Sequence, residues 1–313
     1  HDCDLMIAIG ARFDDRVTGR LDSFSPHSRK IHIDIDPSSI NKNVRVDLAI
    51  VGDAGAVLDS LLTALRRRKG GDAQRLGPWL RQIAEWRARR SFAYEPSATQ
   101  IKPQYAIERL YALTRGREAF ITTEVGQHQM WAAQHFHFEQ PNRWMTSGGL
   151  GTMGYGLPAA IGVQAAHRDA LVIDIAGDAS VQMTMQEMST AVQHDLPVKI
   201  FILNNAYLGM VRQWQELLHG GRYSHSYSAS LPDFVKLAEA YGCVGLRAER
   251  PDELDGKIRL MIETRRPVLF DCVVTQEENV FPMIPSGKAH NEMIFSERRE
   301  TDVEIDASGR VLV

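Results

Sequence analysis

The 313-residue sequence contains only three cysteines, Cys3, Cys243 and Cys272, and no CxxC pair. Their number and spacing exclude a disulfide framework and a zinc ribbon and are typical of a reducing cytosol. No apolar run approaches the ~18 residues of a membrane span, and there is no repeat or low-complexity tract. Because 36 Lys and Arg residues balance 39 Asp and Glu residues, the charge gives no case for nucleic acid or an anionic membrane. We expect a cytoplasmic protein that binds neither.

The beginning of the chain is informative. His1 stands where a start Met is expected, and a strand-like run, Leu5-Met-Ile-Ala-Ile-Gly10, follows at once without a signal-like segment. A domain rarely opens on a core strand, so we interpret the chain as a fragment that begins inside a domain. Its length alone predicts about two domains of ~150 residues each.

Residues 1–68 have the pattern of part of an α/β domain. Strand-like runs occupy residues 5–9, 30–35 and 48–51, and the second alternates Ile with polar residues. The last run leads into a helix with one apolar face that ends in Arg66-Arg67-Arg68. Basic residues there are typical of a helix end. Residues 69–100 are polar and indicate a linker.

From residue 101 the pattern alternates helix and strand. The expected strands cover residues 119–123, 171–176, 198–204, 243–247 and 268–274. The expected helices cover residues 103–114, 157–167, 182–193, 233–241 and 252–264. Strands that are apolar throughout and separated by helices predict a parallel sheet covered on both faces.

A formal GxGxxG motif occurs at residues 149–154, with Asp174 twenty residues after its last glycine. The dinucleotide fingerprint needs a well-formed strand before the first glycine and an acidic residue at the end of the second strand. Here only Arg143-Trp-Met-Thr146 precedes the motif, and Asp174 lies inside a strand. We therefore interpret the loop as a turn that lays its backbone against a flat ligand.

The stronger signal is the pair Asp178 and Asn205. Asp178 follows one buried strand and Asn205 ends the next, so right-handed crossover geometry brings both to the ligand-binding carboxyl edge of the sheet. Their oxygens suit Mg²⁺, which shares its coordination with phosphates, and backbone N–H groups near Ser180 would meet a diphosphate. The alternative is that Asp178 caps a helix and Asn205 only turns the chain.

Five stretches resemble acetohydroxyacid (acetolactate) synthase catalytic subunits, within the thiamin-diphosphate-dependent enzymes. Gly177-Asp178 followed by Asn204-Asn205 is similar to the superfamily's cofactor motif. The resemblance covers roughly residues 1–295 and is carried by residues 10–19, 123–131, 146–158, 209–215 and 282–291. It implies a thiamin-diphosphate-binding fold with a central parallel sheet covered by helices, preceded by part of a second, Rossmann-like α/β domain.

The resemblance also implies roles for residues at matching positions. Asp178, Asn205 and the main-chain carbonyl of Tyr207 would hold Mg²⁺. Met153 would be a catalytic prop that bends the cofactor, and Trp214 would favour 2-ketobutyrate as second substrate, with plain packing as its alternative. Further cofactor contacts would come from Gln127, His128, Gly151, Gly177, Ala179, Ser180, Gly209 and Met210. FAD would contact Arg12, Asp34 and Asp53.

The implied organisation is the end of a central FAD-contacting domain (1–68), a linker (69–100), a thiamin diphosphate and Mg²⁺ domain (101–295) and an unmatched tail (296–313). The implied activity decarboxylates pyruvate and condenses it with a second 2-keto acid in branched-chain amino acid biosynthesis. Active sites would lie at subunit interfaces of a homo-oligomer, with a possible small regulatory subunit.

In that family a glutamate from the first domain of a neighbouring subunit assists catalysis, and neither Glu124 nor Glu187 matches its motif. We therefore predict little carboligase activity from this chain alone. Two alternatives remain. The first is another thiamin-dependent enzyme such as glyoxylate carboligase, of which the run Ala206-Tyr207-Leu208 is reminiscent. The second is a catalytically silent nucleotide-binding fragment.

Overall fold

The structure, a computed structural model, describes residues 1–68, 70 and 73–295. The chain forms two compact units. The first contains residues His1–Ala93 together with the segment from Phe281 onward, and the second contains Tyr94–Val280. Within the described ranges, we find no helix with the length and apolar character needed to cross a membrane.

The first unit is built on a three-stranded parallel sheet. Its strands are β1 (Leu5–Ile9), β2 (Arg29–Asp34) and β3 (Leu48–Val51), in the order β1-β2-β3. Short turns of helix, α1 (Asp15–Thr18), η1 (Leu21–Ser23) and η2 (Pro37–Ser39), connect them. A small core lies beside the sheet, where Phe13 packs edge-on against Phe24 at 5.8 Å between ring centroids. The predicted strands of this region are confirmed.

Two longer helices follow the sheet. The carboxylate of Asp53 accepts a hydrogen bond from the backbone N–H of Ala56 and so begins α2 (Ala54–Arg66). Part of the expected linker is instead helical, as α3 (Ala73–Ala88). Its apolar residues recur at helical spacing, and Trp79 packs edge-on against Trp86 at 5.6 Å. That spacing outweighs the polar composition of the stretch.

The segment after Phe281 packs with the first unit, whereas the sequence suggested that it belongs with the second. The carbonyl of Lys288 accepts a hydrogen bond from the N–H of Arg20 at 3.0 Å. The ring of His290 packs edge-on against Phe24, and its Nε2 atom lies 2.5 Å from the carbonyl of Val17. Contacts between residues far apart in sequence thus decide this boundary. The predicted tail, 296–313, lies outside the described residues.

The second unit is a six-stranded parallel sheet with the strand order β5-β4-β6-β7-β9-β8. Its strands are β4 (Ala119–Thr123), β5 (Trp144–Thr146), β6 (Leu171–Gly177), β7 (Lys199–Asn204), β8 (Val244–Ala248) and β9 (Val268–Val273). Every pair of neighbouring strands is parallel. The predicted fold class, a parallel α/β sheet, is confirmed.

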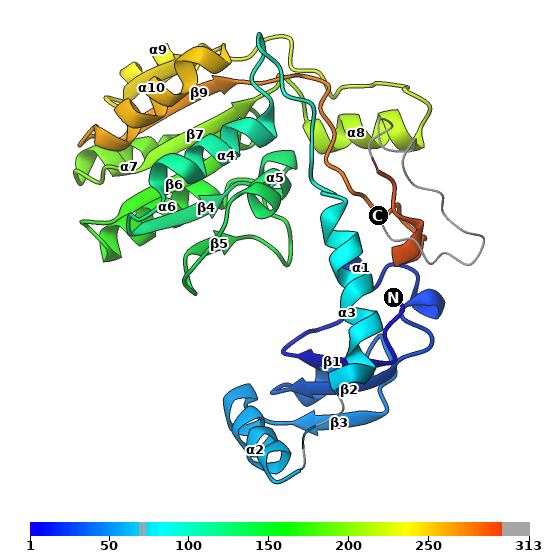
Figure 1. Cartoon of the computed structure of the whole chain (residues 1–313). Helices are drawn as coiled ribbons and strands as arrows, with labels where there is room; N and C mark the ends of the chain where they lie inside the picture. The colour runs from blue at the N-terminus through cyan, green and yellow to red at the C-terminus, as the bar shows by residue number, and fades with distance from the viewer. Residues whose placement is uncertain (69, 71–72, 296–313) are drawn as a thin grey trace. The chain divides into compact units, whose positions relative to one another are not determined.

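Helices cover both faces of this sheet (Figure 1). One core joins α4 (Pro103–Thr114), α5 (Gln127–His135) and α10 (Pro251–Glu263) to the strands. The other core joins α6 (Gly156–Ala166), α7 (Met188–Gln193) and α9 (Phe234–Ala240). Along β7, Phe201 and Leu203 belong to the first core and Ile200 and Ile202 to the second. This alternation explains why the strand is apolar throughout.

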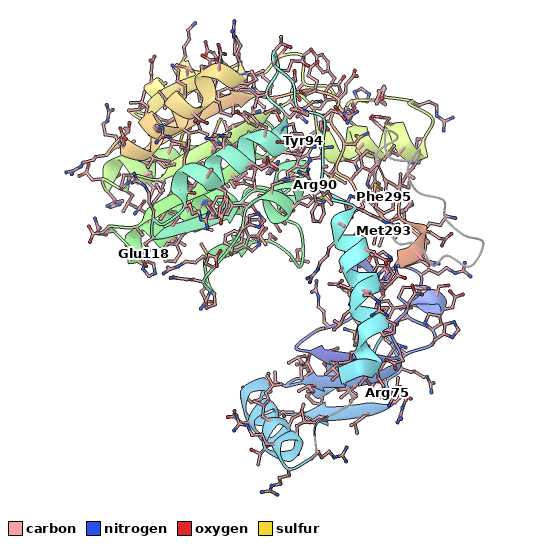
Figure 2. The ribbon with its side chains drawn as sticks, viewed as in Figure 1. Arg75, Arg90, Tyr94, Glu118, Met293 and Phe295 are labelled. Carbon is pink, nitrogen blue, oxygen red and sulfur yellow. The ribbon has the colours of Figure 1, made fainter. Side chains whose placement is uncertain are left out.

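Some elements differ from expectation. The expected helix 182–193 is helical only from Met188, after two 3₁₀ turns, η3 (Ser180–Met183) and η4 (Met185–Glu187). The sequence did not predict β5, α5 or α8 (Gly209–Leu218), nor the 3₁₀ turn η5 (His290–Glu292). Tyr94, labelled in Figure 2, begins the second unit, and its hydroxyl donates to Glu108 Oε2 at 2.8 Å.

Candidate functional site

Three neighbouring strands of the second sheet, β4, β6 and β7, end at the same edge (Figure 1). Each strand is followed by a short polar segment, and these segments lead into α5, η3 and α8 respectively. In open α/β sheets this carboxyl edge is where ligands bind. The predicted convergence of the strand ends is therefore present.

A pocket lies at this edge. Its lining comes from all three strand ends and from one residue of the glycine-rich loop, Met153. The lining residues are Val125, Gly126, Gln127, His128, Trp131, Met153, Gly177, Asp178, Ala179, Ser180, Leu203, Asn205, Tyr207, Leu208, Gly209, Met210 and Val211. It brings together most of the residues predicted for the cofactor site in this unit.

Asp178 is a buried carboxyl group, with 2% of its surface exposed. Its Oδ1 atom accepts a hydrogen bond from the backbone N–H of Ala179 at 3.0 Å, while its Oδ2 atom is buried without a hydrogen-bond partner among the described residues. Burial raises the pKa of this carboxyl group to about 7. A buried carboxylate needs a compensating partner, and a cation in the pocket would provide it.

Asn205 follows β7 and is 6% exposed. Its Oδ1 atom accepts from the N–H of Tyr207 at 3.1 Å, and its Nδ2 atom donates to Oε1 of Gln127 at 3.3 Å. The intervening residue, Ala206, has φ +57°, a conformation that bends the chain sharply after the strand. The turn thus points the Asn205 amide into the pocket that Asp178 also lines.

His128 is buried at the beginning of α5. Its Nε2 atom has no hydrogen-bond partner among the described residues, whereas the ring bonds to the backbone of Glu124. Burial lowers the pKa of His128 to about 3, so the ring is neutral at physiological pH. A Cβ atom at Gly177 would lie 2.7 Å from Nδ1 of this ring. Glycine at that position therefore makes room for the histidine.

The donor set fits Mg²⁺. No group of three or more His, Cys, Asp or Glu side chains arranged to hold a metal occurs within residues 1–68, 70 and 73–295. The predicted set does not require one, because it combines one carboxylate, one amide oxygen and one backbone carbonyl. Such hard oxygen donors suit Mg²⁺, which leaves other positions to water and phosphate. The unpartnered Oδ2 atom of Asp178 is the observation that favours an ion here.

Glu124 holds the glycine-rich loop through two hydrogen bonds that its carboxylate accepts from backbone N–H groups. Its Oε2 atom accepts from the N–H of Gly154 at 2.5 Å and its Oε1 atom from the N–H of Leu157 at 3.2 Å, at the beginning of α6. Asp174 is fully buried inside β6, as the sequence indicated, and accepts from Thr122. Burial raises the pKa of both carboxyl groups. These contacts hold the loop that carries Met153.

Some predicted site residues lie outside the pocket lining. Gly151 has φ +67° and belongs to the loop, but only Met153 of this loop reaches the pocket. The side chain of Trp214, on α8, is 38% exposed and is absent from the lining. Arg12, Asp34 and Asp53 belong to the first unit.

Sequence reasoning missed several lining residues, including Trp131. The sequence did contain a signal for Trp131, because it follows His128 by three positions and so lies on the same face of α5. The helix itself was not predicted. The other missed residues are Val125, Gly126, Leu203, Leu208 and Val211.

Comparison with known protein families agrees with this geometry. Residues 124–272, which include the segments that follow all three strands, match the C-terminal TPP binding domain of thiamine pyrophosphate enzymes, and residues 1–61 match their central domain. The chain belongs to the thiamine pyrophosphate enzyme family. The predicted relationship to thiamin-dependent enzymes is thereby confirmed, thiamin diphosphate being another name for the same cofactor.

Individual relatives in this family carry more specific names. The chain is 47% identical over 305 residues to acetolactate synthase isozyme 3 large subunit of Escherichia coli, covering 96% of the chain and 53% of the relative. It is 46% identical over 301 residues to the acetolactate synthase large subunit of Haemophilus influenzae, covering 96% and 52%. The catalytic subunit from Saccharomyces cerevisiae mitochondria is 45% identical over 326 residues, covering 99% and 47%. The chain thus spans about half the length of these relatives.

Proposed function

We propose that this chain provides the thiamin diphosphate and Mg²⁺ site of an acetolactate synthase. The observation that supports this proposal most directly is the unpartnered, buried Oδ2 atom of Asp178 in a pocket that Asn205 also lines. The similarity to acetolactate synthase large subunits over nearly the whole chain supports the same activity. The reaction would decarboxylate pyruvate and join the product to a second 2-keto acid.

In this proposal Mg²⁺ is held by the Asp178 carboxylate, the Asn205 amide oxygen and the carbonyl of Tyr207. The side-chain N–H groups of Gln127 already donate within the protein, at 2.8 Å to Gln213 and 3.1 Å to the carbonyl of Glu278. The diphosphate would therefore be met by backbone N–H groups at the beginning of α5, where the helix dipole favours an anion. His128 would face it through Nε2.

The remaining pocket residues would position the organic part of the cofactor. Met153 lines the pocket and offers an apolar surface that a ring can bend over. Bound thiamin diphosphate supplies the electron sink for loss of CO₂. The protein keeps water from that step with apolar lining residues such as Leu208 and Trp131. Trp214, partly exposed on α8, would select the second 2-keto acid.

FAD is proposed for the first unit. Arg12 follows β1, Asp34 ends β2 and Asp53 follows β3, so all three lie at the carboxyl edge of that parallel sheet. Ligands of open α/β sheets bind at this edge. Asp53 also caps α2, which gives it a structural role as well.

Partners and location are further proposals. Because the relatives are named large subunits or catalytic subunits, we propose that a small regulatory subunit accompanies the complete enzyme. We also propose that it forms a homo-oligomer with active sites at subunit interfaces. A cytoplasmic location is proposed on the low cysteine content.

The proposed cofactor site is tested by titrating the full chain with thiamin diphosphate, with and without Mg²⁺, by isothermal titration calorimetry. We expect Mg²⁺-dependent binding that is lost in Asp178→Asn, because this change removes the charge that faces the metal. Asp169→Asn is the control, because Asp169 is exposed and follows the C-terminal end of α6. Equal binding by the two variants would overturn the proposal.

Product analysis tests the proposed activity. A complete enzyme that contains this chain is incubated with thiamin diphosphate, Mg²⁺ and FAD, and with pyruvate, pyruvate plus 2-ketobutyrate, or glyoxylate. Acetolactate or acetohydroxybutyrate would support the proposal. Product from glyoxylate alone would favour the glyoxylate carboligase alternative, which the run Ala206-Tyr207-Leu208 suggests.

A further inference from the structure

Two buried glutamines connect the Asn205 amide to a backbone segment far away in the sequence. Nδ2 of Asn205 donates to Oε1 of Gln127 at 3.3 Å, and Nε2 of Gln127 donates to Oε1 of Gln213 at 2.8 Å. Oε1 of Gln213 also accepts from the N–H of Val280 at 2.8 Å, and its Nε2 atom donates to the carbonyl of Val280 at 3.1 Å. We call these three side chains, Asn205, Gln127 and Gln213, the amide relay.

The relay has a direction that the backbone determines. Val280 offers Gln213 one N–H and one carbonyl, so the Gln213 amide bonds to both in only one orientation. The carbonyl of Glu278 likewise accepts from Nε2 of Gln127 at 3.1 Å. Oε1 of Gln127 must then face Asn205, which has to offer Nδ2. Each amide in the chain thus fixes the orientation of the next.

At the Asn205 end of the relay, a second contact independently gives the same orientation of the Asn205 amide. The backbone N–H of Tyr207 donates to Oδ1 of Asn205 at 3.1 Å. A rotated Asn205 amide would place its NH₂ group against this N–H and its oxygen against Oε1 of Gln127, so both contacts would become repulsive. Backbone groups at Tyr207 and at Val280 therefore agree on one orientation of Asn205.

Burial makes this constraint effective. Gln127 is 3% exposed and Gln213 is fully buried. Water cannot easily replace a lost partner in such a place, and an unpaired buried amide is costly. Gly209 packs against the relay, because a Cβ atom there would lie 2.1 Å from Oε1 of Gln127 and 3.0 Å from Nδ2 of Asn205.

We propose that Gln213 is a positioning residue for the metal: through Gln127 it holds Asn205 with Oδ1, not Nδ2, available to Mg²⁺. This inference rests on the proposed function, because it assumes that Asn205 is a metal ligand. It adds that a residue outside the pocket lining, on α8, controls metal affinity. Groups that orient metal ligands in this way commonly change affinity by about 10–100-fold when removed.

The test measures Mg²⁺ affinity of the full chain at saturating thiamin diphosphate, by calorimetry and by quenching of tryptophan fluorescence. Gln213→Met keeps the length of the side chain and removes its amide. We expect its Mg²⁺ affinity to fall about 10–100-fold. The control is Gln164→Met, which removes an equally buried amide that donates to three carbonyls, of His167, Arg168 and Ala170, at the end of α6.

The control separates positioning from general destabilisation. Gln164→Met should lower the melting temperature but leave Mg²⁺ affinity within about 2-fold, since α6 ends at the opposite edge of the sheet from the pocket. A Gln213→Met chain that is folded by circular dichroism and binds Mg²⁺ normally would overturn the inference. Gln213→Glu is the second variant, in case the methionine variant does not fold. Its carboxyl group retains an acceptor toward Gln127 and Val280, so we expect affinity closer to that of the original chain.

Two further comparisons make the result specific. If Gln127 and Gln213 act in series, the losses of Mg²⁺ affinity in Gln127→Met and Gln213→Met are not additive in the double variant. Additive losses would overturn the relay. Asp178→Asn distinguishes this failure from a failure of the proposed function. If Asp178→Asn abolishes Mg²⁺-dependent binding and Gln213→Met does not weaken it, only the relay is wrong.

Discussion

Gly209 and Gln127 are so close that a Cβ atom on the glycine would lie 2.1 Å from Oε1 of the glutamine. The two residues come from different segments, Gly209 from the beginning of α8 and Gln127 from the beginning of α5. The φ angle of Gly209 is not positive, so the backbone conformation does not require a glycine there. It is needed because the Gln127 amide occupies the space where a side chain would be.

Gly209→Ala should therefore weaken cofactor binding more than it weakens the fold. The new methyl group displaces Gln127, and Asn205 loses its hydrogen-bond partner. We expect the affinity for thiamin diphosphate with Mg²⁺ to fall at least ~10-fold, as measured by calorimetry. Gly256→Ala is the matched control, because a Cβ atom there meets nothing within 4 Å in α10. It should bind normally and be slightly more stable. Equal binding by both variants would contradict the steric argument.

The sequence predicted the second sheet well because the apolar runs of its buried strands are unambiguous. Asp178 and Asn205 were placed at one edge by the crossover rule, and the pocket contains both. The glycine-rich loop was distinguished from a dinucleotide fingerprint partly because no well-formed strand was expected before it, yet a short strand, β5, does precede it. A three-residue edge strand is too short to produce a recognisable pattern.

What the sequence could not provide was the set of partners of polar residues. Gln213 looks like any polar residue of a helix, and only the structure shows that it is buried against Val280. Gln127 was predicted to contact the cofactor, but its side-chain donors are already used by the protein. The helix α8 was not predicted, although its apolar residues recur at helical spacing, and its buried residues are the polar Arg212 and Gln213.

His128 should be neutral without ligand, and its pKa should rise when thiamin diphosphate binds. Burial lowers its pKa to about 3, and its Nε2 atom lines the pocket unpartnered. A diphosphate close to Nε2 would favour the charged ring and raise this pKa. We would follow the ¹⁵N-labelled histidine ring by NMR between pH 5 and 8. A His128 signal that titrates near pH 6.5 in the free chain would be evidence against this assignment.

Glu124 should control the order of the glycine-rich loop. Its carboxylate accepts from the N–H groups of Gly154 and Leu157, and each buried hydrogen bond of this kind contributes about 1–3 kcal/mol. We expect hydrogen exchange at these amides to rise about 10-fold or more in Glu124→Ala, as measured by mass spectrometry on peptides covering 147–158. Glu118→Ala is the control, because Glu118 is an exposed residue before β4 that pairs with Arg143. Hydrogen exchange at the same loop amides should not change in this variant. Unchanged exchange in Glu124→Ala would mean that other contacts hold the loop.

The buried carboxyl group of Asp174 should lower the free energy of unfolding at neutral pH. It is fully buried, and burial, followed by the nearby Glu124, raises its pKa well above the usual value. Between the unfolded pKa of about 3.9 and the raised folded pKa, the folded chain binds more protons than the unfolded chain, so stability falls as pH rises. Asp174→Asn removes this titration and keeps an oxygen for the hydroxyl of Thr122.

The melting temperatures of Asp174→Asn and the original chain should therefore coincide near pH 4 and separate as pH increases. At pH 8 we expect the variant to melt at least ~3 °C higher, since ~1 kcal/mol shifts the midpoint by about 2–4 °C in a unit of this size. The substitution Asp169→Asn, at an exposed position, is the control, and its melting temperature should not diverge from that of the original chain in this way. If Asp174→Asn melts lower than the original chain at every pH, then Asp174 is ionised in the folded protein and its negative charge is stabilised there.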